Sequence, residues 1–405
     1  MLRSVQSLMW QDVAADQQHR TCWCHRTSHS TQGGAQVFRA DDGGRARLGG
    51  VVTCGQVWTC PVCAAKVAET RRTELSVAMA RHTLADGRAY LVTFTYPHNM
   101  GNAGQLAAQL DQLAKARQSF QNSRLWKNWT ETAARIGGVT TLEVTYGSNG
   151  WHPHLHMLVF TGQAAFGEGK PDDATGDLHS ATITALASKW VTCLAKVGLC
   201  DRPSLADAMK YAFNVRGGDQ AAEYIQKWGR DAQWGASSEL TRAHAKIGRK
   251  RAGGAWHVTP FQLVALIDDG DDSLIGAWHE YAAAFKGRRM LTWTPGLKRH
   301  FDVLDLDDDD LAAEGIAPTV EESWIGSLSH AQLQAVTSCA KLGDLLVFVA
   351  SRCTEAGGQA QIDAWVATRC PRPLIDGTVR RRFEGHGKFT LMDPNPPRPD
   401  MAVYL

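Results

Sequence analysis

Hydrophobic and polar residues alternate along the chain with two different periods, and these predict strands and helices in a definite order. The segment Tyr90–Tyr96 is rich in β-branched and aromatic residues and precedes Pro97, so it predicts a strand that ends there. The expected elements, in chain order, are helix 64–84, strand 90–96, amphipathic helix 104–126, strands 138–146 and 154–160, and helices 178–197, 219–228, 260–268 and 274–285. This order predicts an α+β fold with a central antiparallel β-sheet flanked by helices.

The two ends of the chain have less regular patterns than the middle. Residues 1–50 are rich in Gly, Arg and Ser with little periodicity, which predicts loops or partly disordered structure. The run Asp305–Asp310 is typical of a solvated linker. The expected organisation is an N-terminal region with a cysteine-rich segment (1–88), a central domain with a basic extension (89–300), an acidic linker (301–317), and a small C-terminal module with a Pro-rich tail (318–405).

Composition indicates a soluble protein with a polyanionic partner. Of the 405 residues 44% are hydrophobic and 21% are charged, and no run approaches the roughly 20 apolar residues that span a bilayer. The polar start of the chain is unlike a secretory signal, so we expect a cytoplasmic protein with no membrane partner. The net charge of +2 hides an asymmetry, because residues 301–405 hold 9 basic and 16 acidic residues. A basic body before an acidic tail suits a polyanion-binding domain.

Alternating histidines mark the strand expected at 154–160. Residues two apart on a strand face the same side, so His154 and His156 present two imidazoles to one face. His152 has the same parity, and Glu143 on the neighbouring strand is a candidate carboxylate ligand. Two imidazoles and a carboxylate suit Mn²⁺, Co²⁺ or Zn²⁺ and, less naturally, Mg²⁺. A polar cross-strand ladder without a metal is the alternative.

A tyrosine and a lysine share one face of the helix expected at 219–228. Tyr224 and Lys227 are three residues apart, which brings their side chains together on a helix. A phenol is a weak nucleophile at its free pKa of about 10, and a nearby cation with a metal-polarised phosphate would make it effective. For this pair taken alone, a half-buried tyrosine beside a surface lysine is the alternative.

Three ordered motifs resemble those of rolling-circle plasmid replication initiators, which belong to the HUH endonuclease superfamily, here of the single-tyrosine type. The motifs are Leu91-Val-Thr-Phe-Thr95, then Glu143 with Gly150-Trp-His-Pro-His-Leu-His156, then Tyr224-Ile-Gln-Lys227. The resemblance covers about residues 54–300, and the Gly-Trp-His-Pro-His-x-His string is specific. It implies a nicking domain at 89–300 in a bacterial protein.

The resemblance also implies a reaction. His154 and His156 would bind a divalent metal, Mg²⁺ or Mn²⁺, with Glu143 or His152 as a candidate further ligand. Tyr224 would attack a scissile phosphate of plasmid origin DNA, either single-stranded or an extruded hairpin. The enzyme would keep the 5′ phosphate, leave a 3′-OH primer and later rejoin strands. Lys227 would steady the phosphate or the tyrosine.

Two further implications concern partners and termination. No P-loop motif for nucleotide binding is present, so a host helicase is an expected partner beside a replication polymerase. Some relatives place a water-activating glutamate one turn before the tyrosine, where this chain has Gln220. Tyr211 is a second nucleophile in principle, but it lacks a lysine three residues later.

The cysteines near the N-terminus have the spacing of a structural zinc site. Cys54 precedes the pair Cys60 and Cys63, which are separated by two residues, and Cys22 or Cys24 would supply a fourth thiolate. His25 is an alternative ligand, and reduced cysteines packed in a small core are the alternative to a metal site. Cys-Pro-x-Cys strings before the first motif also occur in the initiators that this chain resembles.

Basic segments follow the nicking motifs. Their candidate DNA-binding residues are Arg249, Lys250 and Arg251, and then Arg288 and Arg289. Trp256 and Trp293 lie close by in the sequence, and cations with aromatic rings are what a nucleic-acid groove requires. A solvated charged surface is the alternative.

Three other classes of protein share parts of this pattern. A transposase or a conjugative relaxase would use the same histidines and tyrosine. A metal-dependent hydrolase would need further His and Asp ligands at later strand ends and would not need Tyr224. A zinc-containing DNA-binding regulator without catalysis would not need His154.

Overall fold

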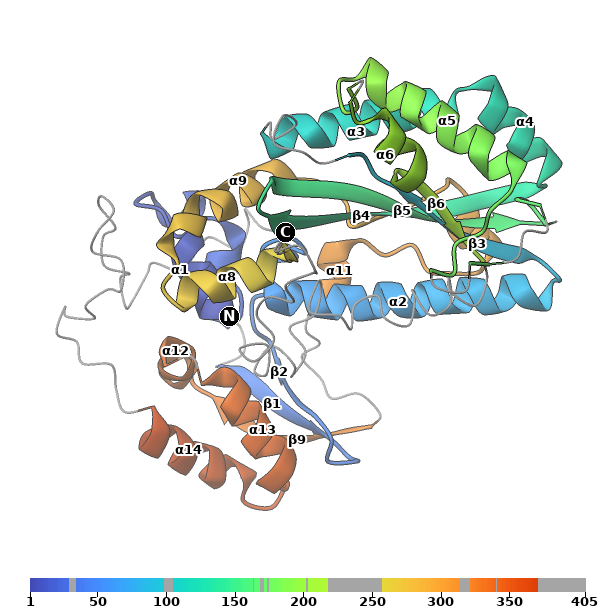
Figure 1. Cartoon of the computed structure of the whole chain (residues 1–405). Helices are drawn as coiled ribbons and strands as arrows, with labels where there is room; N and C mark the ends of the chain where they lie inside the picture. Colours follow the sequence, from blue (N-terminus) through green and yellow to red (C-terminus); the bar gives the residue numbers. More distant parts are fainter. Residues whose placement is uncertain are drawn as a thin grey trace. The chain divides into compact units, whose positions relative to one another are not determined.

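The structure, a computed structural model, describes residues 1–28, 34–97, 105–162, 164–167, 171–172, 175–201, 203–217, 257–313, 321–339 and 341–370. They form two compact units, one of Met1–Cys63 with the chain from Asp308 onward and one of Ala64–Asp307 (Figure 1). This division differs from the boundaries expected at residues 88, 300 and 317. The reason is that one strand near the N-terminus, at Ala35–Ala40, pairs with a strand of the C-terminal segment, at Glu322–Leu328, which places both segments in one unit.

The unit Ala64–Asp307 is built on a six-stranded antiparallel sheet. In spatial order its strands are β6 (Phe213–Arg216), β3 (Arg88–Phe94), β5 (Gly150–Thr161), β4 (Arg135–Gly147) and β7 (His257–Val258), and β8 (Leu291–Trp293) also pairs with β4. β4 and β5 form a hairpin that closes where Gly147 pairs with Gly150. The expected α+β class with a central antiparallel sheet is confirmed.

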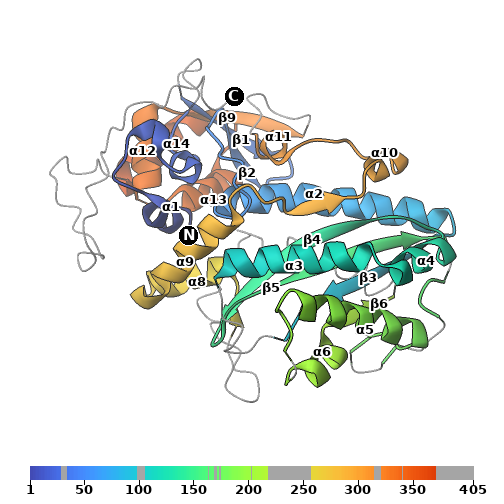
Figure 2. The same ribbon diagram turned by 90° about the horizontal axis from the view of Figure 1, so that it is seen from above.

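One face of this sheet is covered by helices. They are α3 (Leu106–Gln121), α4 (Arg124–Thr132), α5 (Ala181–Lys196) and the short α6 (Leu205–Tyr211). α3 and α5 lie next to each other; α3 packs on β5 and α5 packs on β6 (Figure 2). The rings of Phe94, Phe120 and Trp190 meet edge to face between sheet and helices, with centroids 5.0 to 5.8 Å apart. Each such fully buried side chain contributes about 1.5–3 kcal/mol to folding.

The expected helix 104–126 is interrupted in the structure. α3 ends at Gln121, and Ser123 begins α4 by accepting a hydrogen bond from the Trp126 backbone N–H. A serine hydroxyl satisfies one of the free N–H groups at a helix start, so it favours a new helix over continuation. The kink lets α4 pack Trp126 and Trp129 into the same core as α3.

The opposite face of the sheet carries α2 (Pro61–Leu84) along part of its length (Figure 1). His82 of α2 is buried there, and its Nε2 lies 3.1 Å from the Arg88 carbonyl and 3.0 Å from the Thr161 carbonyl. Its ring packs edge-on against Phe160 and Phe301. His82 therefore fixes the C-terminal end of α2 to the end of this face that is remote from the β4–β5 turn.

The remaining elements of this unit pack near the β4–β5 turn or on the edge of β4. They are α8 (Pro260–Asp268), a 3₁₀ turn (Asp272–Leu274), α9 (Ile275–Phe285) and α10 (Leu297–His300). α8 begins with a capping box, in which Thr259 and Gln262 satisfy each other's backbone N–H groups. Tyr281 of α9 stacks on Trp151 of β5, with centroids 5.3 Å apart.

The other unit contains a three-stranded antiparallel sheet. Its spatial order is β2 (Ala46–Gly49), β1 (Ala35–Ala40) and β9 (Glu322–Leu328). Its helices are α1 (Leu2–Met9), two 3₁₀ turns (Ala15–Gln17 and Arg20–Trp23), α11 (Asp308–Ala312), α12 (His330–Ser338), α13 (Leu342–Arg352) and α14 (Gly358–Arg369). The expectation of loops or disorder through residues 1–50 was wrong, because α1, β1 and β2 are regular elements with buried side chains.

Among the described residues, no single helix is long and apolar enough to span a membrane, although α12 and α13 pass on length and composition when taken together across a bend of 112°. Both helices bury side chains in the core of their unit, including Leu333, Val336, Leu345 and Val349.

Candidate active site

The β4–β5 hairpin brings the histidines and the glutamate of the sequence motif together. The register pairs Glu143 directly with His154 and pairs Thr141 with His156. Leu155, between the two histidines, is buried in the core under α3 and α5, so the imidazoles lie on the opposite face of the sheet. The predicted parity of the strand is confirmed.

The three side chains converge on one point. The Nε2 atoms of His154 and His156 each lie 3.2 Å from Oε2 of Glu143. Metal–ligand bonds of about 2.0–2.2 Å place two ligands of one ion roughly 3 Å apart, which agrees with these separations. Two partly exposed imidazoles and one buried carboxylate therefore fit a divalent cation, and no other described His, Cys, Asp or Glu belongs to this group.

Hydrogen bonds at the second nitrogen orient both imidazoles. Nδ1 of His156 lies 3.0 Å from Oγ1 of Thr93, which pairs with it across β3. Nδ1 of His154 lies 3.4 Å from the carbonyl oxygen of His152. Partners of this kind fix the ring orientation and leave the Nε2 lone pair for a ligand. Thr93 was not among the residues predicted from the sequence, although strand parity in the Leu91–Thr95 motif could have suggested it.

The electrostatics of the site favour a charged carboxylate. Burial by itself would raise the pKa of Glu143, but the facing imidazoles of His156 and His154 hold this pKa well below its usual range. A buried carboxylate that stays ionised needs a positive partner. A protonated imidazole or a bound cation would both provide it.

His152 is held away from this cluster. Its Nε2 lies 3.0 Å from Oγ1 of Thr95 and 3.1 Å from the carbonyl oxygen of Tyr96. The ring also packs edge-on against Tyr96 at 5.1 Å. His152 therefore joins β5 to the end of β3; of the two candidates for a further ligand, Glu143 is the one whose carboxylate converges with His154 and His156.

Four cysteines form a second cluster. They are Cys24, Cys54, Cys60 and Cys63, all buried. Their sulfur atoms are separated by 3.5 Å (Cys60–Cys24), 3.6 Å (Cys54–Cys63) and 3.7 Å (Cys24–Cys63). A tetrahedral zinc with Zn–S bonds of about 2.3 Å has sulfur atoms about 3.8 Å apart, so the set fits this ion.

The structure distinguishes between the two expected candidates for the fourth thiolate. Gln6 of α1 donates hydrogen bonds to the carbonyls of Thr21 and Cys24, at 3.2 and 2.9 Å, and fixes this turn. The Sγ of Cys22 faces the Gln6 carbonyl at 3.8 Å, and burial raises the pKa of Cys22 to about 12. Cys24 thus completes the cluster, while Cys22 and the alternative ligand His25 are outside it.

The position of Cys63 favours a thiolate. It lies in the first turn of α2, whose N-terminus attracts negative charge, and Pro61 occupies the start of that helix. Hydrogen bonds from Cys24, Cys54 and Cys60 hold the pKa of Cys63 well below that of an ordinary thiol, whereas burial raises the pKa of Cys60 well above it. One shared cation would reconcile these four thiols.

Comparison with known proteins gives the family. Residues 45–171 match a family model described as a replication protein. Over 316 residues the chain is 31% identical to "Protein rep" of Streptomyces lividans, an alignment that covers 66% of this chain and 67% of the relative. The chain belongs to this family of replication proteins. A second relative, "Neomycin resistance protein" of Streptomyces cyanogenus, is 28% identical over 181 residues, which cover 38% of this chain and 41% of the relative. No solved structure matches significantly.

The segment that matches the family model includes residues of both clusters. The segment of this replication protein that matches the family model contains Glu143, His154 and His156, and also Cys54, Cys60 and Cys63. The resemblance to replication initiators expected from the sequence is confirmed at the level of the family.

Several predicted residues of this replication protein lie outside the described residues. They are Tyr224 and Lys227, Gln220, and the basic residues Arg249, Lys250 and Arg251. Tyr211, the second tyrosine considered, is described at the end of α6, 54% exposed and with Nζ of Lys210 4.9 Å from its ring centroid. Arg288 forms an ion pair of 2.8 Å with Asp111, and Arg289 is exposed.

Proposed function

We propose that this replication protein initiates rolling-circle replication of a plasmid by nicking one strand of origin DNA at the Glu143–His154–His156 cluster. The observation that carries the proposal is the convergence of His154 Nε2 and His156 Nε2 on one Glu143 oxygen, in a motif that also resembles HUH endonucleases. Membership in a family of replication proteins supports DNA as the substrate.

Each residue of the site has a proposed task. A bound Mg²⁺ or Mn²⁺ would offset the charge that develops on the scissile phosphate. Glu143, His154 and His156 would hold that cation, and Thr93 would keep the ring of His156 in position. Tyr224 would be the nucleophile, and Lys227 would steady the phosphate or the phenolate.

The proposed step conserves the phosphodiester. The Tyr224 oxygen bonds to phosphorus as its proton leaves, the bond between phosphorus and the 3′ oxygen breaks, and that oxygen takes up a proton. A 5′-phosphotyrosine link and a free 3′-OH primer result, and the reverse reaction rejoins a strand. The DNA would be single-stranded or an extruded hairpin. A host helicase and a replication polymerase would continue from the primer.

The cysteine cluster has a separate proposed role. Cys24, Cys54, Cys60 and Cys63 would hold a structural zinc, a closed tetrahedral set that leaves no position for a substrate. This ion would stabilise the segment that carries Cys24 and the start of α2.

The alternative of a metal-dependent hydrolase has less support. Such a site needs further His and Asp ligands at later strand ends, and in the part of the chain that the structure describes none joins Glu143, His154 and His156. A transposase or relaxase would use the same chemistry and would differ from a plasmid initiator in the DNA on which it acts.

A denaturing protein gel tests the proposal. The protein is incubated with Mn²⁺ and labelled single-stranded DNA from the origin of the replicon that carries its gene. We expect a covalent protein–DNA band that is lost with EDTA, in Tyr224→Phe and in His156→Ala, and that persists in the control Tyr211→Phe. A band that survives Tyr224→Phe, or none from the wild type on a verified origin, would contradict the proposal.

A further inference from the structure

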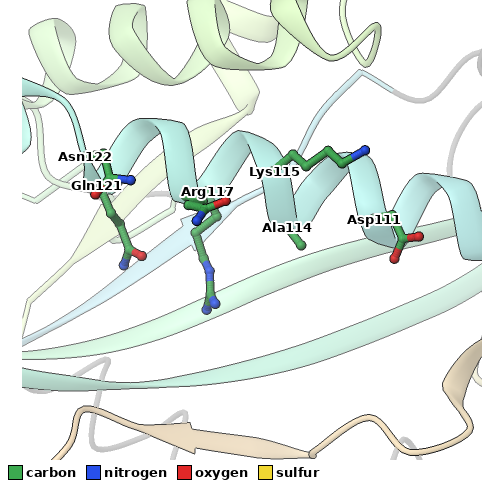
Figure 3. Close-up of a pocket in the computed structure, with 7 residues that line it drawn as sticks. Asp111, Ala114, Lys115, Arg117, Gln121 and Asn122 are labelled. Atoms are coloured by element: carbon green, nitrogen blue, oxygen red, sulfur yellow. The ribbon is translucent and has the colours of Figure 1, made fainter.

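The outer side of α3 carries a polar hollow that no motif of the sequence pointed to. Its volume is about 540 Å³, and its described lining consists of Asp111, Ala114, Lys115, Arg117, Gln118, Gln121 and Asn122. Figure 3 shows Asp111, Ala114, Arg117 and Gln121 extending to the same side of the helix, with Lys115 pointing away from them. The buried side of α3, with Leu113 and Phe120, faces the core, so the hollow and the metal cluster belong to opposite faces of the sheet.

The guanidinium of Arg117 is the unusual group in this hollow. It is half-buried and forms no hydrogen bond or ion pair with any residue that the structure describes. Burial without a partner lowers the pKa of Arg117, since it disfavours the charged form. Placing a cation partly out of water is unfavourable unless an anion joins it, so this position suits an anionic ligand.

The charges around Arg117 reinforce this preference. Lys115 is exposed two residues away from Arg117. At the other end of the hollow, Arg288 donates hydrogen bonds to Asp111 at 2.8 Å and to the Ala284 carbonyl at 2.8 Å. Asp111 is thereby neutralised by Arg288. Along this part of α3, Lys115, Arg117 and Arg288 thus outnumber one carboxylate, and Gln118, Gln121 and Asn122 add neutral N–H donors.

We propose that this row of polar residues on α3, from Asp111 to Asn122 and completed by Arg288, binds backbone phosphates of duplex DNA. The ten residue steps from Asp111 to Gln121 extend about 15 Å along the helix, which corresponds to roughly four base-pair steps of duplex. Lys, Arg, Gln and Asn are the side chains that contact phosphates and position a protein on DNA. No aromatic side chain is among the described lining residues, which favours a duplex backbone over stacked single-stranded bases.

The inference rests on the proposal that the chain acts on DNA, but it concerns a separate surface and has its own readout. Fluorescence anisotropy of a labelled duplex of about 30 base pairs, titrated between roughly 50 and 200 mM NaCl, measures affinity and its salt dependence. Each lost phosphate contact lowers the slope of log affinity against log salt by about 0.9. The double variant Lys115→Gln with Arg117→Gln is therefore expected to bind about tenfold more weakly, with a slope smaller by about 2.

A matched control removes the same charge elsewhere. Lys189→Gln with Lys196→Gln neutralises two cations on α5 and is expected to change the affinity and the slope little. Asp111→Asn provides a test in the opposite direction, because it removes the only carboxylate of the row and releases Arg288, so duplex binding should become tighter.

Three outcomes decide the inference. Support requires weaker duplex binding for the α3 double variant, tighter binding for Asp111→Asn, and retained covalent attachment to a short single-stranded oligonucleotide by both. An α3 double variant that matches the α5 control would overturn it, whether or not inorganic phosphate binds the hollow. If the wild type binds duplex through α3 yet forms no covalent link, the proposed function fails and this inference stands.

Discussion

Thr93→Val is the sharpest test of how the site is preorganised. The substitution keeps the size and β-branching of the side chain and removes only the Oγ1 that lies 3.0 Å from Nδ1 of His156. A single hydrogen bond of this kind contributes about 1 kcal/mol to stability, so the fold should persist. The ring of His156 would lose its orienting partner, and such losses reduce metal affinity about 10–100-fold, equal to about 1.4–2.7 kcal/mol.

Calorimetric titration with Mn²⁺ measures this effect. Thr145→Val is the matched control. Thr145 lies on the same face of β4 as Glu143, but it pairs with His152 and not with His154 or His156. We expect the control to bind Mn²⁺ like the wild type. Equal Kd values for Thr93→Val and wild type would refute the reasoning, and so would an equal loss in both variants.

Two experiments on the cysteines and one on the core between α3 and the sheet test the structure further. Cys24→Ala should lose zinc, as measured by elemental analysis, and lower the melting temperature, whereas Cys22→Ala should keep the metal. At pH 8 the thiol of Cys22, with a pKa of about 12, remains protonated. Maleimide should therefore label the exposed Cys339 first, and label Cys22 only at much higher pH or after unfolding. Rapid labelling of Cys22 in the folded protein would be inconsistent with this. Phe120→Ala should lower the free energy of unfolding by about 3–5 kcal/mol in urea titrations. A loss below about 1 kcal/mol would contradict the burial of Phe120 between α3 and the sheet.

The β4–β5 hairpin could be predicted from the sequence because its determinants are local. Alternation with period two fixes which side chains share a face, and a short turn fixes the register, so Glu143 opposite His154 follows from the chain itself. The role of His152 does not follow in the same way. Its parity matches that of the ligands, but Thr95 and Tyr96 at the end of β3 hold its ring, and only the tertiary structure shows this.

The unit that contains Met1–Cys63 could not be predicted from the sequence, because the pairing that joins its two segments is not local. β1 and β2 are short, and β1 pairs with β9, a strand almost at the other end of the chain. Patterns within a window of 11–18 residues cannot reveal such a partner. The choice of Cys24 over Cys22 is similar, because the spacing Cys-x-Cys permits either and the contact with Gln6 of α1 decides it.

Mapping the DNA adduct tests the central claim most directly. The covalent complex formed on origin DNA with Mn²⁺ would be trimmed with nuclease, digested with a protease and sequenced by mass spectrometry. The account predicts a nucleotide joined through its 5′ phosphate to Tyr224, and a matching 3′-OH on the released strand. An adduct on Tyr211 or on any other residue, or cleavage of origin DNA with no adduct, would contradict it.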